Sequence, residues 1–263
     1  MKFPLNHDLH CHSVLSECSS DPEMTVERIL RHAEEHGYSV QCITDHLWDA
    51  AVPGASKWYA PQDIAHVKQS LPLPKSDSVK LVFGCETEYV GGSGVAIAPE
   101  HYDEFDFIVI PPNHFHMVGL TRPREVDTEE KAAELFTARL EELSALDLPW
   151  KKVGIAHLTC GLTFREGDYM KVFRIMDEER LKAAFKRFAE NGAGIELNSG
   201  SIGGTDWRGH IDDELRLYRI ARDMGCKFYC ATDAHHPAEL ETESLREIAD
   251  RLELTDKELF PLP

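Results

Sequence analysis

Positive charge and long apolar runs are both scarce in this sequence. Its 263 residues include 28 lysines and arginines against 46 aspartates and glutamates, which gives a formal net charge of -18. A surface this acidic repels a phosphate backbone, so we do not expect duplex nucleic acid as a partner. No run of about 18 apolar residues is present, which argues against a membrane-spanning helix. The first residues also lack the apolar stretch of an export signal, and we expect a cytoplasmic location.

A disulfide framework is also not indicated. The seven cysteines are an odd number in a chain without export signals. Cys42, Cys226 and Cys230 fall in apolar, strand-like runs, and we expect them to be reduced core residues. Apolar residues make up 42% of the chain, so a globular protein of this length can form its core without disulfides or a structural metal.

Short apolar runs alternate with amphipathic stretches along the whole chain. The apolar runs cover residues 8–11, 40–44, 80–85, 107–110, 153–156, 194–197 and 227–231. The helical stretches cover 25–36, 128–145, 177–191 and 212–224, with Thr25, Thr128 and Asp212 as expected N-caps. Strands that alternate with helices predict a parallel sheet, and seven repeats favour a closed barrel over an open sheet. We expect residues 1–263 to form one α/β domain.

Histidines and carboxylates follow six of the seven predicted strands. Loops at the carboxyl ends of barrel strands build the active site, so these side chains are expected at one rim. A single histidine at a strand end is more often structural, but independent structural roles would not all fall at one end of the sheet. The residues concerned are His10, His12, Asp45, His46, Glu86, His114, His116, His157, Asp233 and His235.

This set of side chains predicts a multinuclear metal site. His10 and His12 are two residues apart in a strand, so both imidazoles face the same side and can share one ion. Imidazole and carboxylate ligands suit Zn²⁺, Mn²⁺ or Fe²⁺, and the number of ligands exceeds the need of one tetrahedral ion. Two such ions can generate a bridging hydroxide and stabilise both oxygens of an in-line displacement, which is the chemistry of phosphoester hydrolysis.

In order, these motifs resemble those of the PHP (polymerase and histidinol phosphatase) family. The resemblance spans residues 8 to 236. It rests on Asp8-Leu9-His10-Cys11-His12-Ser13, Thr44-Asp45-His46, Gly84-Cys85-Glu86, His114, His157 and Asp233-Ala234-His235. It implies a distorted (β/α)7 TIM-like barrel, two or three divalent ions (Zn, Mn or Fe), and hydrolysis of a small phosphorylated metabolite.

The resemblance also implies a distribution of ligands among the ions. One ion would be held by His10, His12, Glu86 and Asp233. Glu86 would bridge to a second ion held by His114 and His157, and a third ion would take His46 and His235. The family commonly has histidine or aspartate where this chain has Cys18. Cys18 as a thiolate ligand, replacement by Glu17 or Asp21, and an incomplete third site are the open alternatives.

Further residues are candidates for substrate binding and proton transfer. Arg165 and Arg208 follow the fifth and sixth predicted strands, where each can reach a phosphate or lie in a solvated loop. His116 is expected to orient substrate or to be simply exposed. Asp45 is expected to orient a ligand imidazole. His116 and Asp45 are both candidate donors of the leaving-group proton. Glu86 and Asp233 are expected at the reacting centre.

Other functions are compatible with the same ligand set. A metal-activated hydroxide attacks carbonyls as well, so hydrolysis of an amide or a non-phosphate ester is one alternative. A non-catalytic metal-binding PHP module is another, although all the main motif residues are present. Exonuclease activity is disfavoured by the net negative charge of the chain, which repels a nucleic-acid substrate.

Overall fold

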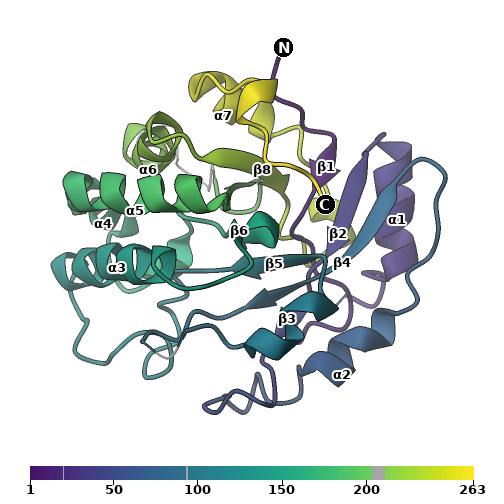
Figure 1. Cartoon of the computed structure of the whole chain (residues 1–263), viewed down its shortest axis with the longest axis horizontal. Coiled ribbons are helices and arrows are strands. Elements are labelled where there is room, and N and C mark those ends of the chain that lie inside the picture. The colour runs from purple at the N-terminus through teal and green to yellow at the C-terminus, as the bar shows by residue number, and fades with distance from the viewer. Residues whose placement is uncertain (20, 93, 203–210) are drawn as a thin grey trace.

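The computed structural model describes residues 1–19, 21–92, 94–202 and 211–263. Its centre is a parallel sheet in the order β1-β2-β4-β5-β6-β7-β8, surrounded by helices (Figure 1). A short β3 (His46–Leu47) follows β2 in the chain and pairs with β4. The seven main strands are β1 (His7–Asp8), β2 (Val40–Ile43), β4 (Lys80–Thr87), β5 (Phe107–Ile110), β6 (Val153–Ile155), β7 (Gly194–Asn198) and β8 (Lys227–Ala231).

Backbone hydrogen bonds between the first and last strand segments bring the sheet close to a closed barrel. Leu9 N donates to Cys230 O at 3.0 Å, and Asp233 N donates to His10 O at 2.7 Å. The seven-stranded α/β barrel is therefore confirmed. The strand predicted at residues 8–11 forms fewer strand-to-strand pairs than expected. β1 pairs with β2 only at His7 and Asp8, and the next amide, Leu9 N, donates to Cys230 O of β8.

The helices begin largely where their capping residues predict. Thr25 accepts a hydrogen bond from Arg28 N, and Thr128 accepts one from Lys131 N. The prediction of Asp212 as an N-cap is wrong, because Asp212 lies inside the first turn of its helix, where a carboxylate still favours the helix dipole. The helices are α1 (Val26–Glu35), α2 (Ile64–Val67), α3 (Glu129–Ser144), α4 (Tyr169–Ile175), α5 (Glu178–Asn191), α6 (Ile211–Asp223) and α7 (Leu245–Arg251). None of the described helices is long and apolar enough to cross a bilayer.

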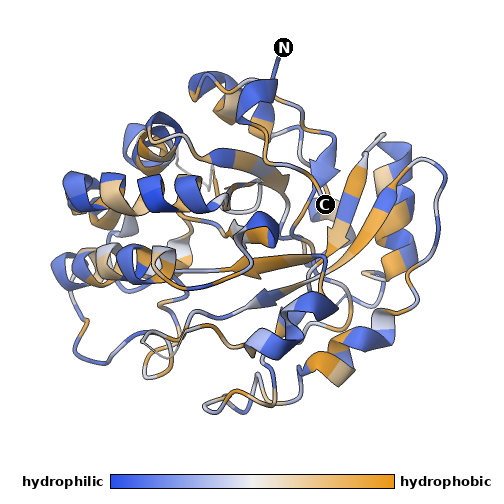
Figure 2. Cartoon of the chain, in the orientation of Figure 1, coloured by the Kyte–Doolittle hydropathy of each residue, from blue (hydrophilic) through white to orange (hydrophobic). Residues whose placement is uncertain are grey.

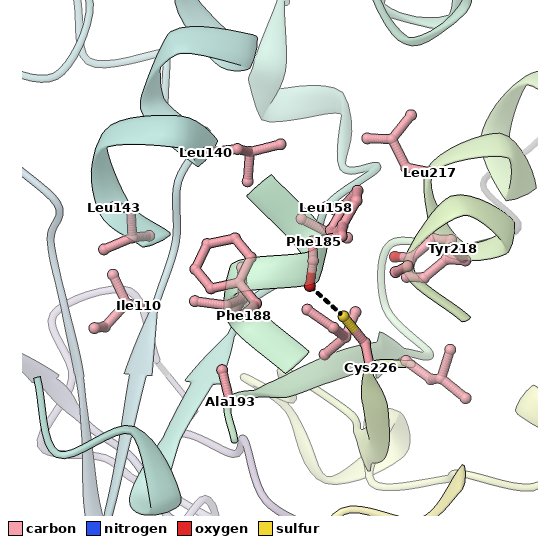
Figure 3. Packing of buried hydrophobic residues seen from close by; sticks show 14 of the residues in the cluster. Ile110, Leu140, Leu143, Leu158, Phe185, Phe188, Ala193, Leu217, Tyr218 and Cys226 are labelled. Carbon is pink, nitrogen blue, oxygen red and sulfur yellow. Dashed lines mark hydrogen bonds between the residues drawn. The ribbon is translucent and has the colours of Figure 1, made fainter. Parts of the chain in front are cut away.

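The main core lies between the sheet and the outer helices. Figure 2 shows apolar strands at the centre and polar outer faces on α3 and α5. Phe185 and Phe188 of α5 pack toward Leu140 of α3 (Figure 3). Cys226 lies among these residues and its thiol donates to Phe185 O at 3.2 Å. All seven cysteines are free, and Cys42, Cys226 and Cys230 are buried as predicted.

A second core fills the barrel interior. Phe107 and Tyr229 pack edge to face with ring centroids 5.2 Å apart, and Phe260 from the C-terminal segment packs against both rings. Phe260 is anchored by its amide, which donates to Phe228 O at 2.8 Å. These aromatic side chains fill the barrel below the carboxyl ends of the strands, where the candidate site residues gather.

Packing inside the barrel depends on the absence of a side chain at Gly154. A Cβ there would lie 2.2 Å from the Tyr229 hydroxyl and 2.7 Å from Phe107 Cζ. Gly154→Ala is therefore expected to lower the free energy of unfolding by about 1–3 kcal/mol, measured by urea denaturation. Gly92→Ala is the control, because nothing lies within 4 Å of a Cβ at that position. Equal stability of both variants would contradict this packing.

Candidate metal centre

The carboxylate of Glu86, at the end of β4, lies at the centre of the histidines on the rim. Its Oε2 atom is 3.6 Å from His10 Nε2, 3.5 Å from His12 Nε2 and 2.8 Å from His46 Nδ1. Asp233 Oδ1 completes this side of the cluster at 3.4 Å from His10 Nε2 and 3.1 Å from His12 Nε2. The structure therefore brings together the four residues that the family resemblance assigned to the first ion.

The other oxygen of Glu86 faces a second group of ligands. Oε1 lies 3.3 Å from His157 Nε2 and 3.9 Å from His114 Nε2. One potential ligand atom from each of these three residues falls within 4.8 Å of the others. Glu86 thus has one oxygen toward each group, which is the arrangement needed for a carboxylate that bridges two ions.

A third group contains the cysteine that departs from the family pattern. Ligand atoms of His12, Cys18, His46 and His235 all lie within 4.8 Å of one another. Burial raises the pKa of Cys18, but hydrogen bonds with His235 and His46 outweigh burial and lower it. Lowered thiol pKa values favour the thiolate that a soft cation prefers.

The alternatives to Cys18 lie elsewhere. Asp21 Oδ2 is 3.5 Å from His236 Nδ1, and Asp21 Oδ1 accepts from Glu23 N at 2.9 Å. The exposed Glu17 contributes its backbone amide to Gln62. Of the three candidates, only Cys18 lies within the group of potential ligands described above.

Buried nitrogen and carboxylate atoms that crowd together indicate that this centre fits cations. His10 Nδ1 lies 2.9 Å from Glu196, a carboxylate that accepts, so His10 turns Nε2 toward His12 Nε2 at 3.1 Å. Burial lowers the pKa of His12 to about 3, so the His12 ring is neutral. His46 Nδ1 lies 2.8 Å from Glu86 Oε2, and both atoms are shielded from solvent. Acceptor atoms this close to one another repel unless a proton or a metal ion lies between them.

The electrostatic field at this position attracts positive charge. Burial lowers the pKa of His10, but the surrounding carboxylates outweigh burial and raise it well above the usual value. Burial likewise raises the pKa of Asp233, whereas His10 and His12 lower it further than burial raises it. A pocket that draws a proton onto His10 also favours a divalent cation bound to the same atoms.

Two of the predicted ligands have strained backbone conformations. His157 has φ 22° and Asp233 has φ 54°, both in the region that disfavours residues with a side chain. Among the described residues with side chains, only Glu253 shares a positive φ. Backbone strain of this kind persists where the surroundings hold it in place. Here His157 reaches Glu86 at 3.3 Å, and Asp233 reaches His12 at 3.1 Å.

Glu196, on β7, was missed by the sequence analysis. Its carboxylate accepts from His10 Nδ1 at 2.9 Å, from His157 N at 3.3 Å and from the Tyr229 hydroxyl at 3.0 Å. A lone acidic residue inside an apolar strand was the available signal, since buried charges need partners. With Glu196, all seven main strands contribute a polar side chain to this end of the barrel.

Glu88 was also missed, and it holds His114 of the second group as Glu196 holds His10. Its Oε1 accepts from His114 Nδ1 at 2.6 Å and from the Tyr59 hydroxyl. Glu86 and Glu88 are two residues apart on an extended segment, so the spacing rule that paired His10 with His12 predicts a shared side here too.

Asp45 is connected through Ser16 to His12, one of the predicted ligands. It accepts from Ser13 Oγ at 2.6 Å and from Ser16 Oγ at 2.7 Å, and Ser16 Oγ in turn lies 3.0 Å from His12 Nδ1. Since the serine proton is directed to Asp45, Ser16 accepts from His12 and fixes its tautomer. Asp45 does not line the described site cavity, and this geometry favours positioning over proton donation.

The cavity above Glu86 contains the remaining candidates that the structure describes. Its wall combines the ligand side chains with His116, Arg165 and an apolar surface. Burial lowers the pKa of His116 to about 4, so this ring is neutral at physiological pH. Arg208 lies outside the described residues. The apolar wall consists of Trp58, Met117, Val118, Leu120 and Leu162.

Comparison with known proteins identifies the family. The PHP domain profile matches residues 8–200, well over half of the chain. The chain therefore belongs to the PHP domain family. A search of curated proteins finds no match.

Two solved PHP-like structures share the fold. The histidinol phosphate phosphatase (HisK) of Lactococcus lactis, in complex with Zn, L-histidinol and phosphate, is 17% identical, with a TM-score of 0.60 over 98% of this chain and 99% of that one. The putative histidinol phosphatase of Listeria monocytogenes is 14% identical, with a TM-score of 0.66 over 90% of this chain and 98% of that one.

Removal of the charge on Glu196 should loosen the centre without removing a ligand. Glu196→Gln keeps the shape but weakens the acceptor that fixes His10, so we expect a 10- to 100-fold loss of metal affinity, roughly the cost of losing such an orienting partner. Competition with a chromogenic chelator measures it. The exposed Glu125→Gln is the matched control. Parent-like affinity in Glu196→Gln would show that Glu196 does not orient the ligand.

Proposed function

We propose that this PHP protein hydrolyses phosphoesters of small metabolites at the centre around Glu86. Family membership and the histidinol phosphatase neighbours support metal-dependent phosphoesterase activity. The observation that carries the proposal is the convergence of three adjoining ligand groups on one open cavity, with Glu86 shared by two of them.

Bound divalent ions would supply a low-pKa water and stabilise charge on the phosphoryl oxygens. His10, His12, Glu86 and Asp233 would hold one ion, and His114 and His157 with Glu86 a second. Cys18, His46 and His235 would hold a third. Because nitrogen and carboxylate donors dominate the first two groups and a thiol joins only the third, we propose Zn²⁺, Mn²⁺ or Fe²⁺, with Zn²⁺ favoured beside Cys18.

The other cavity residues would bind and orient the substrate. Arg165 offers a guanidinium that can pair with two phosphate oxygens at once. The neutral His116 is suited to hydrogen bonding with the ester rather than to donating a proton at neutral pH. Trp58 and Leu162 provide an apolar surface for the alcohol part of the substrate.

Hydrolysis of a carboxylic ester or amide is the second candidate, since the same metal chemistry attacks carbonyls. The cationic Arg165 on the cavity wall favours a phosphorylated substrate over an uncharged one. Histidinol phosphate is a reasonable first substrate to test, because the Lactococcus lactis neighbour was solved with L-histidinol and phosphate.

Loss of the bridging carboxylate should abolish turnover by removing metal. Glu86→Gln and Asp233→Asn are each expected to reduce phosphate release by more than about 10²-fold, which exceeds the effect of losing a residue that only orients a metal ligand. The parent should contain two to three equivalents of transition metal when purified without chelator, and the variants fewer. His101→Gln, whose ring pairs with Asp49 and does not line the site cavity, is the control. Parent-like metal content and turnover in both ligand variants would contradict the proposal.

The substrate class is tested at Arg165. Arg165→Met should lower kcat/KM for an aryl phosphate by roughly 10- to 100-fold, as expected for a lost hydrogen bond to a charged group, and should weaken inhibition by inorganic phosphate to a similar degree. The substrate class is measured with a panel of histidinol phosphate, nucleotides and an aryl phosphate. A carboxylic ester of the alcohol in the aryl phosphate is included for comparison. Arg124→Met, in an exposed loop, is the control. An unchanged phosphate inhibition constant would exclude Arg165 from phosphate binding.

A further inference from the structure

A separate cluster of potential ligands lies at the other end of the barrel. It consists of His32 in the last turn of α1, His36 at the end of that helix, and Glu241 in the segment before α7. One ligand atom from each lies within 4.8 Å of the others. His36 precedes β2, so the cluster lies near the amino ends of the strands, where barrels carry stabilising rather than catalytic features.

Both imidazoles have a nitrogen free to bind. His36 Nδ1 lies 2.9 Å from His32 O, and a carbonyl can only accept, so Nδ1 carries the proton and Nε2 the lone pair. That Nε2 is 3.9 Å from Glu241 Oε2. His32 Nε2 is shielded from solvent and has no hydrogen-bond partner. An unpartnered, buried nitrogen beside a second lone pair and a carboxylate oxygen is what a cation site requires.

The carboxylate is held in place and directed toward the histidines. Glu241 Oε1 accepts from Glu243 N at 3.0 Å, which leaves Oε2 to face His36. The nearby Arg246 is engaged elsewhere, because its guanidinium donates to Phe3 O at 2.9 Å and lies 3.8 Å from Glu243. Among the described residues, the Arg246 guanidinium therefore has partners other than Glu241.

The local field and geometry also favour a cation. The C-terminal end of α1 carries the negative end of the helix dipole, which stabilises positive charge. Residues four apart on a helix face the same side, as His32 and His36 do. Their rings are stacked, with centroids 3.9 Å apart and an interplanar angle of 18°, so the His36 ring has to turn for both lone pairs to meet one ion. Tetrahedral Zn²⁺ with bonds near 2.1 Å places its ligands about 3.4 Å apart. The His36 and Glu241 side chains are 43% and 48% exposed, so both can adjust toward that spacing.

We propose that His32, His36 and Glu241 form a second, peripheral Zn²⁺ site that fastens α1 to the segment before α7. Two imidazoles and one carboxylate leave the fourth position for water, as in other three-ligand zinc sites. The ion would join two elements that flank β1, where the barrel closes between its first and last strands. The site is independent of the function proposed above, since none of its residues reaches the catalytic centre.

Zinc binding to the full-length chain tests this proposal. Protein dialysed against buffered free Zn²⁺ is analysed for metal, and thermal unfolding is followed over the same Zn²⁺ series. His36→Gln and Glu241→Gln should each bind one equivalent fewer than the parent and lose part of the Zn²⁺-dependent rise in Tm. Glu243→Gln removes the same charge next to Glu241 and should behave as the parent. Phosphoester turnover should be unchanged in all three.

The two proposals fail separately in this experiment. Glu86→Gln should bind fewer zinc equivalents at the catalytic centre. Adding His36→Gln to that variant should still remove one further equivalent. Equal zinc content and equal Tm shifts in the parent, His36→Gln and Glu241→Gln would overturn the peripheral site and leave the catalytic proposal untouched.

Discussion

The crowding of histidine nitrogens around one buried carboxylate is the constraint on which the rest of the structure depends. Glu86 presents Oε2 to His46 at 2.8 Å and Oε1 to His157 at 3.3 Å, while His10 and His12 face each other at 3.1 Å. Acceptor atoms so close and so shielded from water repel unless positive charge lies between them, and bound cations would supply that charge in place of protons. The centre is therefore arranged to attract positive charge.

The barrel and its second layer of contacts hold this arrangement in place. Aromatic side chains fill the interior below the rim, and the Tyr229 hydroxyl extends from that layer to Glu196. Glu196 and Glu88 then fix the tautomers of His10 and His114 from outside the ligand set. Packing and chemistry are thus connected through a few buried hydrogen bonds, and these should tolerate substitution less well than the exposed helix faces.

Much of this could be predicted from the chain, because alternating strands and helices require a parallel sheet and place strand-end residues at one rim. The grouping of Cys18 with His46 and His235 was only one of three alternatives, since a loop residue has no periodicity that fixes its direction. Glu196 was missed because a buried acid in an apolar strand shows its purpose only when its partners from other strands are known. Asp212 was predicted as the cap but is the second residue of α6, because acidic residues favour both the cap and the first turn of a helix.

The most direct test is an anomalous-difference map from crystals of the full chain grown with Zn²⁺ or Mn²⁺. The account predicts separate peaks on the two sides of the Glu86 carboxylate, one within about 2.0–2.3 Å of ligand atoms of His10 and His12 and one at a similar distance from His114 and His157. Absence of any peak within bonding distance of Glu86, in crystals where the ion is bound elsewhere on the chain, would contradict it.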